Sequence, residues 1–162
     1  MANVKDTRTG KRKEGIIVYF EAFRAGAVYR LQPVTLSAAE IVAFAREFDP
    51  QRIHVDPNFA AQGPFGGLIA SGYHTLAAVW KRWIEAGVLG DESMGGPGLD
   101  EVKWLAPVRP DDVLNTTVTI STTRRSERLE RGIVSLHFDV VNQDGIRVMT
   151  CDGAVMVQLA PR

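Results

Sequence analysis

The sequence has few of the features that mark several protein classes. It contains one cysteine, Cys151, so an internal disulfide cannot form. Its 19 basic and 19 acidic residues give a formal net charge of +0, without the positive excess typical of nucleic-acid-binding proteins. It also lacks a long apolar run and a charged-then-apolar leader. We therefore expect a soluble, cytoplasmic protein with neither a nucleic-acid nor a membrane partner.

The length favours one domain. A chain of 162 residues is long enough to bury a hydrophobic core without a metal or disulfide staple. Residues 1–15 carry five basic and two acidic side chains and almost nothing apolar, so we expect a flexible N-terminal tail there. The acidic residues in this run argue against a nucleic-acid or membrane arm. Residues 16–162 then form the single domain.

The segment before Pro50 has the pattern of an amphipathic helix. Ser37 and Glu40 have the spacing of a capping box, in which each residue satisfies a free amide at the helix start. Apolar residues recur at helical intervals at Ile41, Phe44, Ala45 and Phe48. Pro50 disfavours helical geometry in the preceding residue, so the helix should end with the Asp49 carboxylate at its exit.

A second helix is predicted over 72–87, after a loop rich in glycine and proline at 62–67. Gly72 begins it and Gly87 is placed to end it. Residues 76–80 are apolar on every side for more than one turn, which indicates a helix wrapped by a sheet.

From Gly98 onward the hydrophobic periodicity changes to two, which is typical of strands. The predicted strands are 102–105, 113–121, 132–141 and 146–159. Residues 142–145, with the sequence NQDG, have the composition of a hairpin turn. A helix packed on a curved antiparallel sheet is an α+β architecture.

Two further segments carry weaker patterns. Residues 124–132 (RRSERLERG) read as a charged, solvated link between strands. Residues 16–34 mix aromatic and branched residues around Gly26, which suits a short strand leading into the domain.

Asp49 and His54 are the candidate chemical groups, because they lie five positions apart between the two helices. The intervening residues PQRI are too few for a separate element, so one tight connection could bring both side chains together. A carboxylate beside an imidazole can move protons in both directions. The amide of Gly72 at a helix start suits a carbonyl oxygen that gains negative charge. This combination suits adding water to, or removing it from, a carbon chain conjugated to a carbonyl.

Each of these residues also has a structural interpretation. An Asp-Pro pair is common at helix exits and turns, as at Asp49 and Pro50. His54 could be a hydrogen-bonded loop residue, and Gly72 could be a helix start and nothing more. The pair followed by the glycine loop favours function over these readings.

The stretch FAREFDPQRIHVDPNFAAQGPFGGLIASGYHTL resembles the hydratase motif of the MaoC-like dehydratases and (R)-specific enoyl-CoA hydratases, and WLAPVRPDD at 104–112 resembles their strand and turn before the meander. The resemblance covers roughly residues 18–158. It implies a hotdog fold, in which a curved antiparallel sheet wraps a central helix. It also implies that Asp49 and His54 are catalytic and that the Gly72 amide polarises a thioester carbonyl.

The same resemblance implies a hydro-lyase of the enoyl-CoA hydratase or 3-hydroxyacyl-CoA dehydratase type. Its substrate would be an acyl-CoA or acyl-carrier thioester, with no cofactor, and the protein would be a homodimer or a larger homo-oligomer. The commonest family pattern has asparagine at the position of Gln51, proline at that of Arg52 and often glycine at that of Asp111, so the sequence departs from it at these three positions. Trp80 stands where some hydratases have serine, and its bulk is expected to shorten or reshape the acyl tunnel.

Two rival functions fit parts of the pattern. A hotdog thioesterase would hydrolyse the thioester without needing both Asp49 and His54, and a non-catalytic subunit would bind acyl thioesters only. The histidines and Cys151 do not occur at metal-ligand spacing, so we predict no metal site. His74 is expected to be packed and hydrogen-bonded, and Cys151 to lie in the core.

Overall fold

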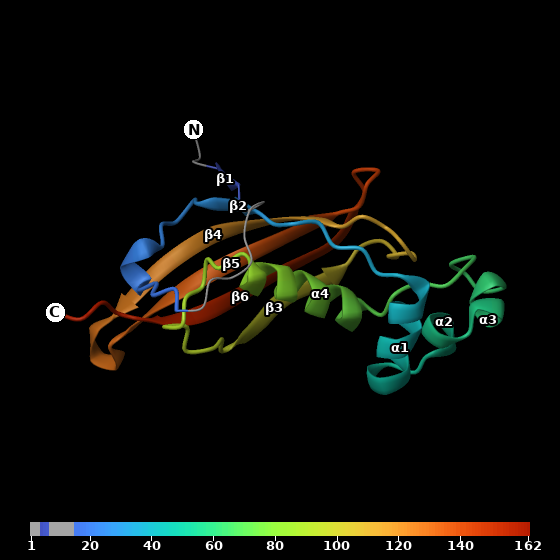
Figure 1. The fold of residues 1–162 in the computed structure, drawn as a ribbon, viewed down its shortest axis with the longest axis horizontal. Helices are drawn as coiled ribbons and strands as arrows, with labels where there is room; N and C mark the ends of the chain where they lie inside the picture. Colours follow the sequence, from blue (N-terminus) through green and yellow to red (C-terminus); the bar gives the residue numbers. More distant parts are fainter. Residues whose placement is uncertain (1–3, 7–14) are drawn as a thin grey trace.

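A computed structural model describes residues 4–6 and 15–162 of the protein (Figure 1). Its α-helices are α1 (Ala38–Phe48), α2 (Arg52–Val55), α3 (Pro57–Ala61) and α4 (Gly72–Glu85). Its strands are β1 (Val4–Asp6), β2 (Val28–Arg30), β3 (Gly98–Trp104), β4 (Asn115–Ser126), β5 (Arg131–Val141) and β6 (Arg147–Gln158). Two 3-10 turns, Phe20–Ala22 and Glu127–Leu129, complete the elements. The α+β class predicted from the sequence is confirmed.

The strands form one sheet in the order β1-β2-β4-β5-β6-β3. The short β1 pairs parallel with β2, and every other neighbouring pair is antiparallel. Alternate side chains of β5 are buried, as the period of two requires. The predicted turn at 142–145 joins β5 to β6, closed by the bond from the Gly145 amide to the Asn142 carbonyl. These long central strands form the face of the sheet on which α4 packs.

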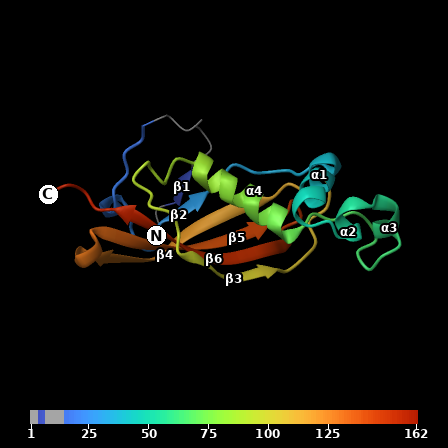
Figure 2. The ribbon, with the colours of Figure 1, turned by 90° about the horizontal axis from the view of Figure 1, so that it is seen from below.

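Helix α4 lies along one face of the sheet (Figure 2). Its buried stripe is Thr75, Val79 and Trp83, spaced one helical turn apart. The Trp83 ring meets Tyr29 edge-to-face at 5.5 Å and Phe138 at 6.2 Å between ring centroids. The sequence predicted burial on every side, but Ala77 is exposed, because this chain's sheet covers one side of the helix and the other side is open.

The three shorter helices are grouped beyond one end of the sheet, next to the start of α4 (Figure 1). The capping box at the start of α1 is present, with the Ser37 hydroxyl accepting from the Glu40 amide and the Glu40 carboxylate accepting from the Ser37 amide. The helix ends at Phe48 with Asp49 as its C-cap, so the stop predicted from Pro50 is confirmed. Local sequence therefore places the carboxylate at the mouth of the helical cluster.

Of three expectations about local structure, the first was wrong, the second holds for part of its range and the third is confirmed. The connection after Pro50 is not a plain turn, since it contains the single-turn helix α2, and α3 follows with Asp56 as its N-cap and Pro57 in its first turn. The predicted charged link at 124–132 is shorter than expected, because β4 and β5 stay paired out to Ser126 and Arg131, and only residues 127–130 connect them. The short strand predicted within 16–34 is present as β2, which spans Val28–Arg30.

Most of the N-terminal segment, residues 1–3 and 7–14, lies outside the described part of the chain. The flexible tail predicted over 1–15 therefore stays a prediction, with Val4–Asp6 described as strand β1. Among the residues that are described, no helix is both long enough and apolar enough to cross a membrane.

Candidate active site

Asp49 and His54 converge. Asp49 caps the C-terminus of α1, while His54 lies on α2 and is buried. The backbone between them is tight, because the Gln51 amide donates to the Asp49 carbonyl at 2.8 Å and the His54 amide donates to the Gln51 carbonyl at 2.9 Å. As a result, Nε2 of His54 lies 3.5 Å from Oδ2 of Asp49. The expected meeting of these two side chains is observed.

A backbone carbonyl orients the imidazole. Nδ1 of His54 lies 2.8 Å from the carbonyl oxygen of Ile69, and a carbonyl oxygen can only accept. Nδ1 therefore carries a hydrogen, and in the neutral ring Nε2 presents its lone pair toward Asp49. The imidazole is thus held in the tautomer of a base aimed at the carboxylate side.

Both oxygens of the Asp49 carboxylate accept hydrogen bonds. The Ser71 hydroxyl donates to Oδ2 at 2.6 Å, and the Gln51 side-chain amide donates to Oδ1 at 2.8 Å. The Ser71 hydrogen bond holds the pKa of Asp49 below its usual value, with smaller lowering contributions from Gln51 and His54 and an opposing one from burial. Asp49 is therefore ionised at neutral pH.

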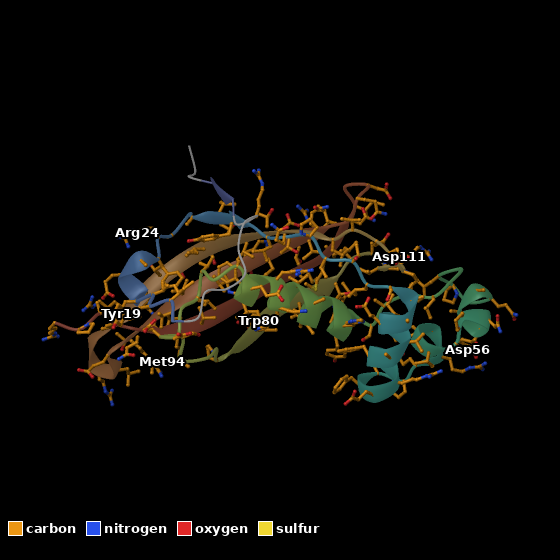
Figure 3. The ribbon with its side chains drawn as sticks, viewed as in Figure 1. Tyr19, Arg24, Asp56, Trp80, Met94 and Asp111 are labelled. Carbon is orange, nitrogen blue, oxygen red and sulfur yellow. The ribbon has the colours of Figure 1, made fainter. Side chains whose placement is uncertain are left out.

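The family departures at Gln51 and Asp111 have local explanations. Gln51 is one methylene longer than asparagine, yet its amide still reaches Asp49. Asp111, labelled in Figure 3, has a φ of 64°, the left-handed region that glycine occupies most easily and aspartate tolerates. Arg52 turns away from Asp49, since its guanidinium pairs with Asp56 at 2.9 Å.

Gly72 and His54 line one cavity of about 280 Å³, together with Phe65, Thr75, Trp104 and other residues. The Asp49 carboxylate is not part of this lining, although its side chain keeps 15% of its surface exposed. Gly72 is the first residue of α4, where backbone amides have no partner within the helix. A carbonyl group entering the cavity would meet this electropositive helix end beside the imidazole.

A second cavity of about 350 Å³ lies along the open side of α4 and is mostly apolar. It is lined by Tyr73, Leu76, Trp80 and Leu99 among others. Trp80, near the middle of α4 in Figure 3, also packs against Phe138 with 5.9 Å between ring centroids. The predicted effect of Trp80 on an acyl tunnel stays a prediction.

The other candidate side chains lie apart from this site. His74 stacks on Phe44 at 4.4 Å, as a packed residue should, but its buried Nδ1 has no hydrogen-bond partner among the described residues, so the predicted hydrogen bond is wrong at that atom. Burial lowers the pKa of His74, and nearby Glu40 opposes this. His137 pairs with Asp152 at 2.6 Å on strands β5 and β6. Cys151 is buried in the core.

The prediction of no metal site stays a prediction. Within residues 4–6 and 15–162, no group of three or more His, Cys, Asp or Glu side chains is arranged to hold a metal ion.

Ser71 is the site residue that sequence reasoning missed. It is the N-cap of α4, and a serine immediately before a predicted helix start is a standard capping pattern. That pattern could have identified the cap. The bond to Asp49, 22 positions earlier, depends on how the chain folds back and has no local pattern.

The chain is similar in sequence to known proteins of one family. Residues 21–142 match the family model described as MaoC like domain. The chain is 36% identical over 138 residues to an uncharacterised Bacillus subtilis protein, YdeM, covering 85% of this chain and 97% of that protein. It is 31% identical over 121 residues to a 3-hydroxybutyryl-CoA dehydratase of Methylorubrum extorquens, covering 70% of this chain and 72% of that protein.

Solved structures give the same result. The crystal structure of a MaoC-like dehydratase from Rhodospirillum rubrum aligns with a TM-score of 0.81 at 34% identity, covering 90% of this chain and 99% of that one. A Mycobacterium tuberculosis protein described as a double hotdog fold aligns with a TM-score of 0.71 at 17% identity, covering 89% of this chain and 45% of that one. The hotdog fold predicted from the sequence is confirmed.

Proposed function

This chain belongs to the MaoC-like dehydratase family, and we propose that it adds water to, or removes water from, a 2-enoyl thioester. In this proposal Asp49 and His54 are the acid-base pair, and the Gly72 amide is the donor to the thioester oxygen. The proposal rests above all on one observation, which is that Nε2 of His54 and Oδ2 of Asp49 lie 3.5 Å apart.

If both atoms are hydrogen-bond acceptors, a donor must lie between them at this distance. Nε2 of neutral His54 has a lone pair, since Nδ1 donates to Ile69, and ionised Asp49 has only acceptors. A water molecule about 2.8 Å from both atoms could donate one hydrogen to each. Its oxygen lone pairs would then be free to attack carbon. A resting ion pair of protonated histidine and carboxylate is the alternative, and it would leave no such nucleophile.

The proposed hydration then balances. One O–H bond of the water breaks as its oxygen bonds to the β-carbon, and Nε2 of His54 takes the proton. The electron pair of the double bond moves onto the thioester oxygen, next to the Gly72 amide. The Asp49 and His54 pair returns one proton to the α-carbon, so that one water is added in all. Dehydration follows the same steps in reverse.

The substrate class follows from the chemistry and the relatives. Proton transfer at the α-carbon requires an electron-withdrawing carbonyl, which a thioester supplies. One relative is named 3-hydroxybutyryl-CoA dehydratase, and others are named 3-hydroxyacyl-thioester dehydratase. We therefore propose a 3-hydroxyacyl thioester of CoA or of an acyl carrier protein.

The direct test is a hydration assay on short, branched and medium enoyl-CoA substrates, which follows loss of the conjugated double bond. Asp49→Asn and His54→Ala should each lower turnover by about a hundredfold or more, because each removes acid-base help. Each variant should keep the wild-type circular dichroism spectrum. Wild-type rates in both variants would contradict these roles.

The same assay separates the two rival functions. A thioesterase would release free CoA thiol, which a thiol reagent detects, while a hydratase leaves the thioester intact. A binding subunit would show no turnover on any substrate of the panel but would retain affinity for the thioester.

We further propose that the protein is a homodimer formed at β3. This strand is the edge of the sheet opposite β1, and six of its seven residues are exposed. Large apolar side chains are exposed along it and beside it, at Tyr73, Leu99, Trp104 and Leu105. An uncovered apolar edge strand is an association site, so a second copy of this chain is the expected partner.

A further inference from the structure

Ser71 has more contacts than its capping role requires. An N-cap side chain needs only to accept a hydrogen bond from a first-turn amide, and Ser71 does this for Tyr73 at 3.3 Å. Its single hydroxyl hydrogen is not needed for capping, and it is donated to Oδ2 of Asp49 at 2.6 Å. Ser71 has no exposed surface, so water cannot replace either contact. The donor half of this hydroxyl is therefore committed to the carboxylate.

The bond joins two elements that carry the proposed chemistry. Asp49 is the C-cap of α1, and Ser71 immediately precedes Gly72, the first residue of α4. The other donor to Asp49, Gln51, is exposed and only two residues away, so it orients the carboxylate within its own turn. The contact from Ser71 is the one that fixes Asp49 relative to the helix end at Gly72.

We propose that Ser71 is a positioning residue, whose buried hydroxyl holds Oδ2 of Asp49 toward Nε2 of His54 and in register with the Gly72 amide. This inference rests on the proposed function. Ser71 acts through the Asp49 carboxylate, to which its only hydroxyl hydrogen is donated, so it is not itself a catalytic residue.

The role predicts a change in the pH profile. The ionisable and polar groups that act on Asp49 are His54, Gln51 and Ser71, and the Ser71 bond lowers its pKa most. Loss of the hydroxyl should raise the pKa of Asp49 toward its usual value. Activity requires the ionised carboxylate, so it falls as the pH drops through this pKa. The acidic limb of the kcat/KM profile should therefore move to higher pH.

Three substitutions separate positioning from helix capping. Ser71→Ala removes the hydroxyl and the cap, Ser71→Gly removes the hydroxyl but is a tolerable N-cap, and Ser71→Thr keeps both. Ala and Gly should lower kcat by about tenfold or more, with little change in KM, because the lost bond is to a charged group. Both should shift the acidic limb equally, although thermal unfolding should show that Ala is the less stable. Thr should restore rate and profile.

A substrate-free measurement keeps this inference distinct from the proposed function. Carbon-13 NMR can titrate the Asp49 carboxyl in the wild type and in Ser71→Gly. A higher pKa in the variant supports the contact even if no enoyl thioester is turned over, in which case the proposed function fails alone. An unchanged Asp49 titration, or wild-type kcat and pH profile in both Ala and Gly variants, would overturn the positioning role.

Discussion

The indole ring of Trp104 lies directly against the Cα of Gly72, so that a Cβ at position 72 would overlap the ring. Trp104 comes from the edge strand β3 and also meets the Tyr73 ring edge-to-face at 5.5 Å. The first residue of α4 is therefore covered by an aromatic ring that lines the same cavity as His54. Only glycine allows this approach. Position 72 therefore has a steric requirement for glycine, in addition to the proposed role of its amide as donor to the thioester oxygen.

Gly72→Ala should destabilise the protein, against the usual preference for alanine in helices. Alanine favours a helix over glycine by about 1 kcal/mol, but overlap with a packed ring costs about 1–3 kcal/mol. We expect a lower unfolding midpoint in urea and a lower hydration rate as Trp104 is displaced. Gly63→Ala is the matched control, since a Cβ there would make ordinary contacts of 3.5 Å or more. A Gly72→Ala variant more stable than the wild type would contradict this packing.

Leu99→Lys should weaken the proposed homodimer. Leu99 is 42% exposed on the edge strand β3, so lysine there should change the stability of a single chain by no more than about 0.5 kcal/mol. At an interface the same charge would be buried without a partner, and the dissociation constant should rise about tenfold or more. Light scattering across a dilution series measures this. Ile146→Lys, also exposed but on the turn after β5, is the control. A wild-type monomer at all concentrations would contradict the dimer.

Elements with local causes were predicted well from the sequence. The capping box of Ser37 and Glu40, the stop at Pro50 and the turn at 142–145 each depend on a few neighbouring residues. The structure has all three, because the chemistry that forms them is contained in the pattern that identified them. The proximity of Asp49 and His54 belongs to this group, since it arises within six consecutive residues, through two backbone hydrogen bonds at Gln51.

Features with distant causes could not be predicted in this way. The charged residues at 124–132 have no strand pattern of their own, yet pairing of β4 with β5 extends one strand to Ser126 and begins the next at Arg131. The bond between Ser71 and Asp49 requires the start of α4 to return to the end of α1. The open side of α4 depends on how far the sheet curves. In each case contacts between distant segments decide the structure, and the local sequence does not show them.

Cys151 should be inert to thiol reagents in the native protein. Burial raises the pKa of its thiol, and the neighbouring carboxylates of Asp152 and Asp100 raise it further, so little thiolate forms near neutral pH. It is also 1% exposed, so a reagent cannot reach it without opening of the sheet. An aromatic disulfide reagent should react negligibly with the folded protein and with one thiol per chain in denaturant. Rapid reaction of the folded protein would contradict the core position.

The ionised state of Asp49 should contribute to stability only above acidic pH. Its pKa in the folded protein lies below the reference value of 3.8, so the unfolded chain binds a proton first as the pH falls. The stabilisation from the charged carboxylate is therefore fully present above about pH 5, and it is lost as the pH drops through the folded pKa, below 3.8.

Urea unfolding of the wild type and of Asp49→Asn, from neutral pH to about pH 3, measures this dependence. Asparagine keeps the shape of the side chain and can still accept from Ser71, so the comparison isolates the charge. The free energy of unfolding of the wild type should exceed that of the variant at neutral pH, and the difference should shrink at the acidic end. A difference that is constant with pH would mean that Asp49 has the same pKa in the folded and unfolded chains, which the short bond from a buried hydroxyl argues against.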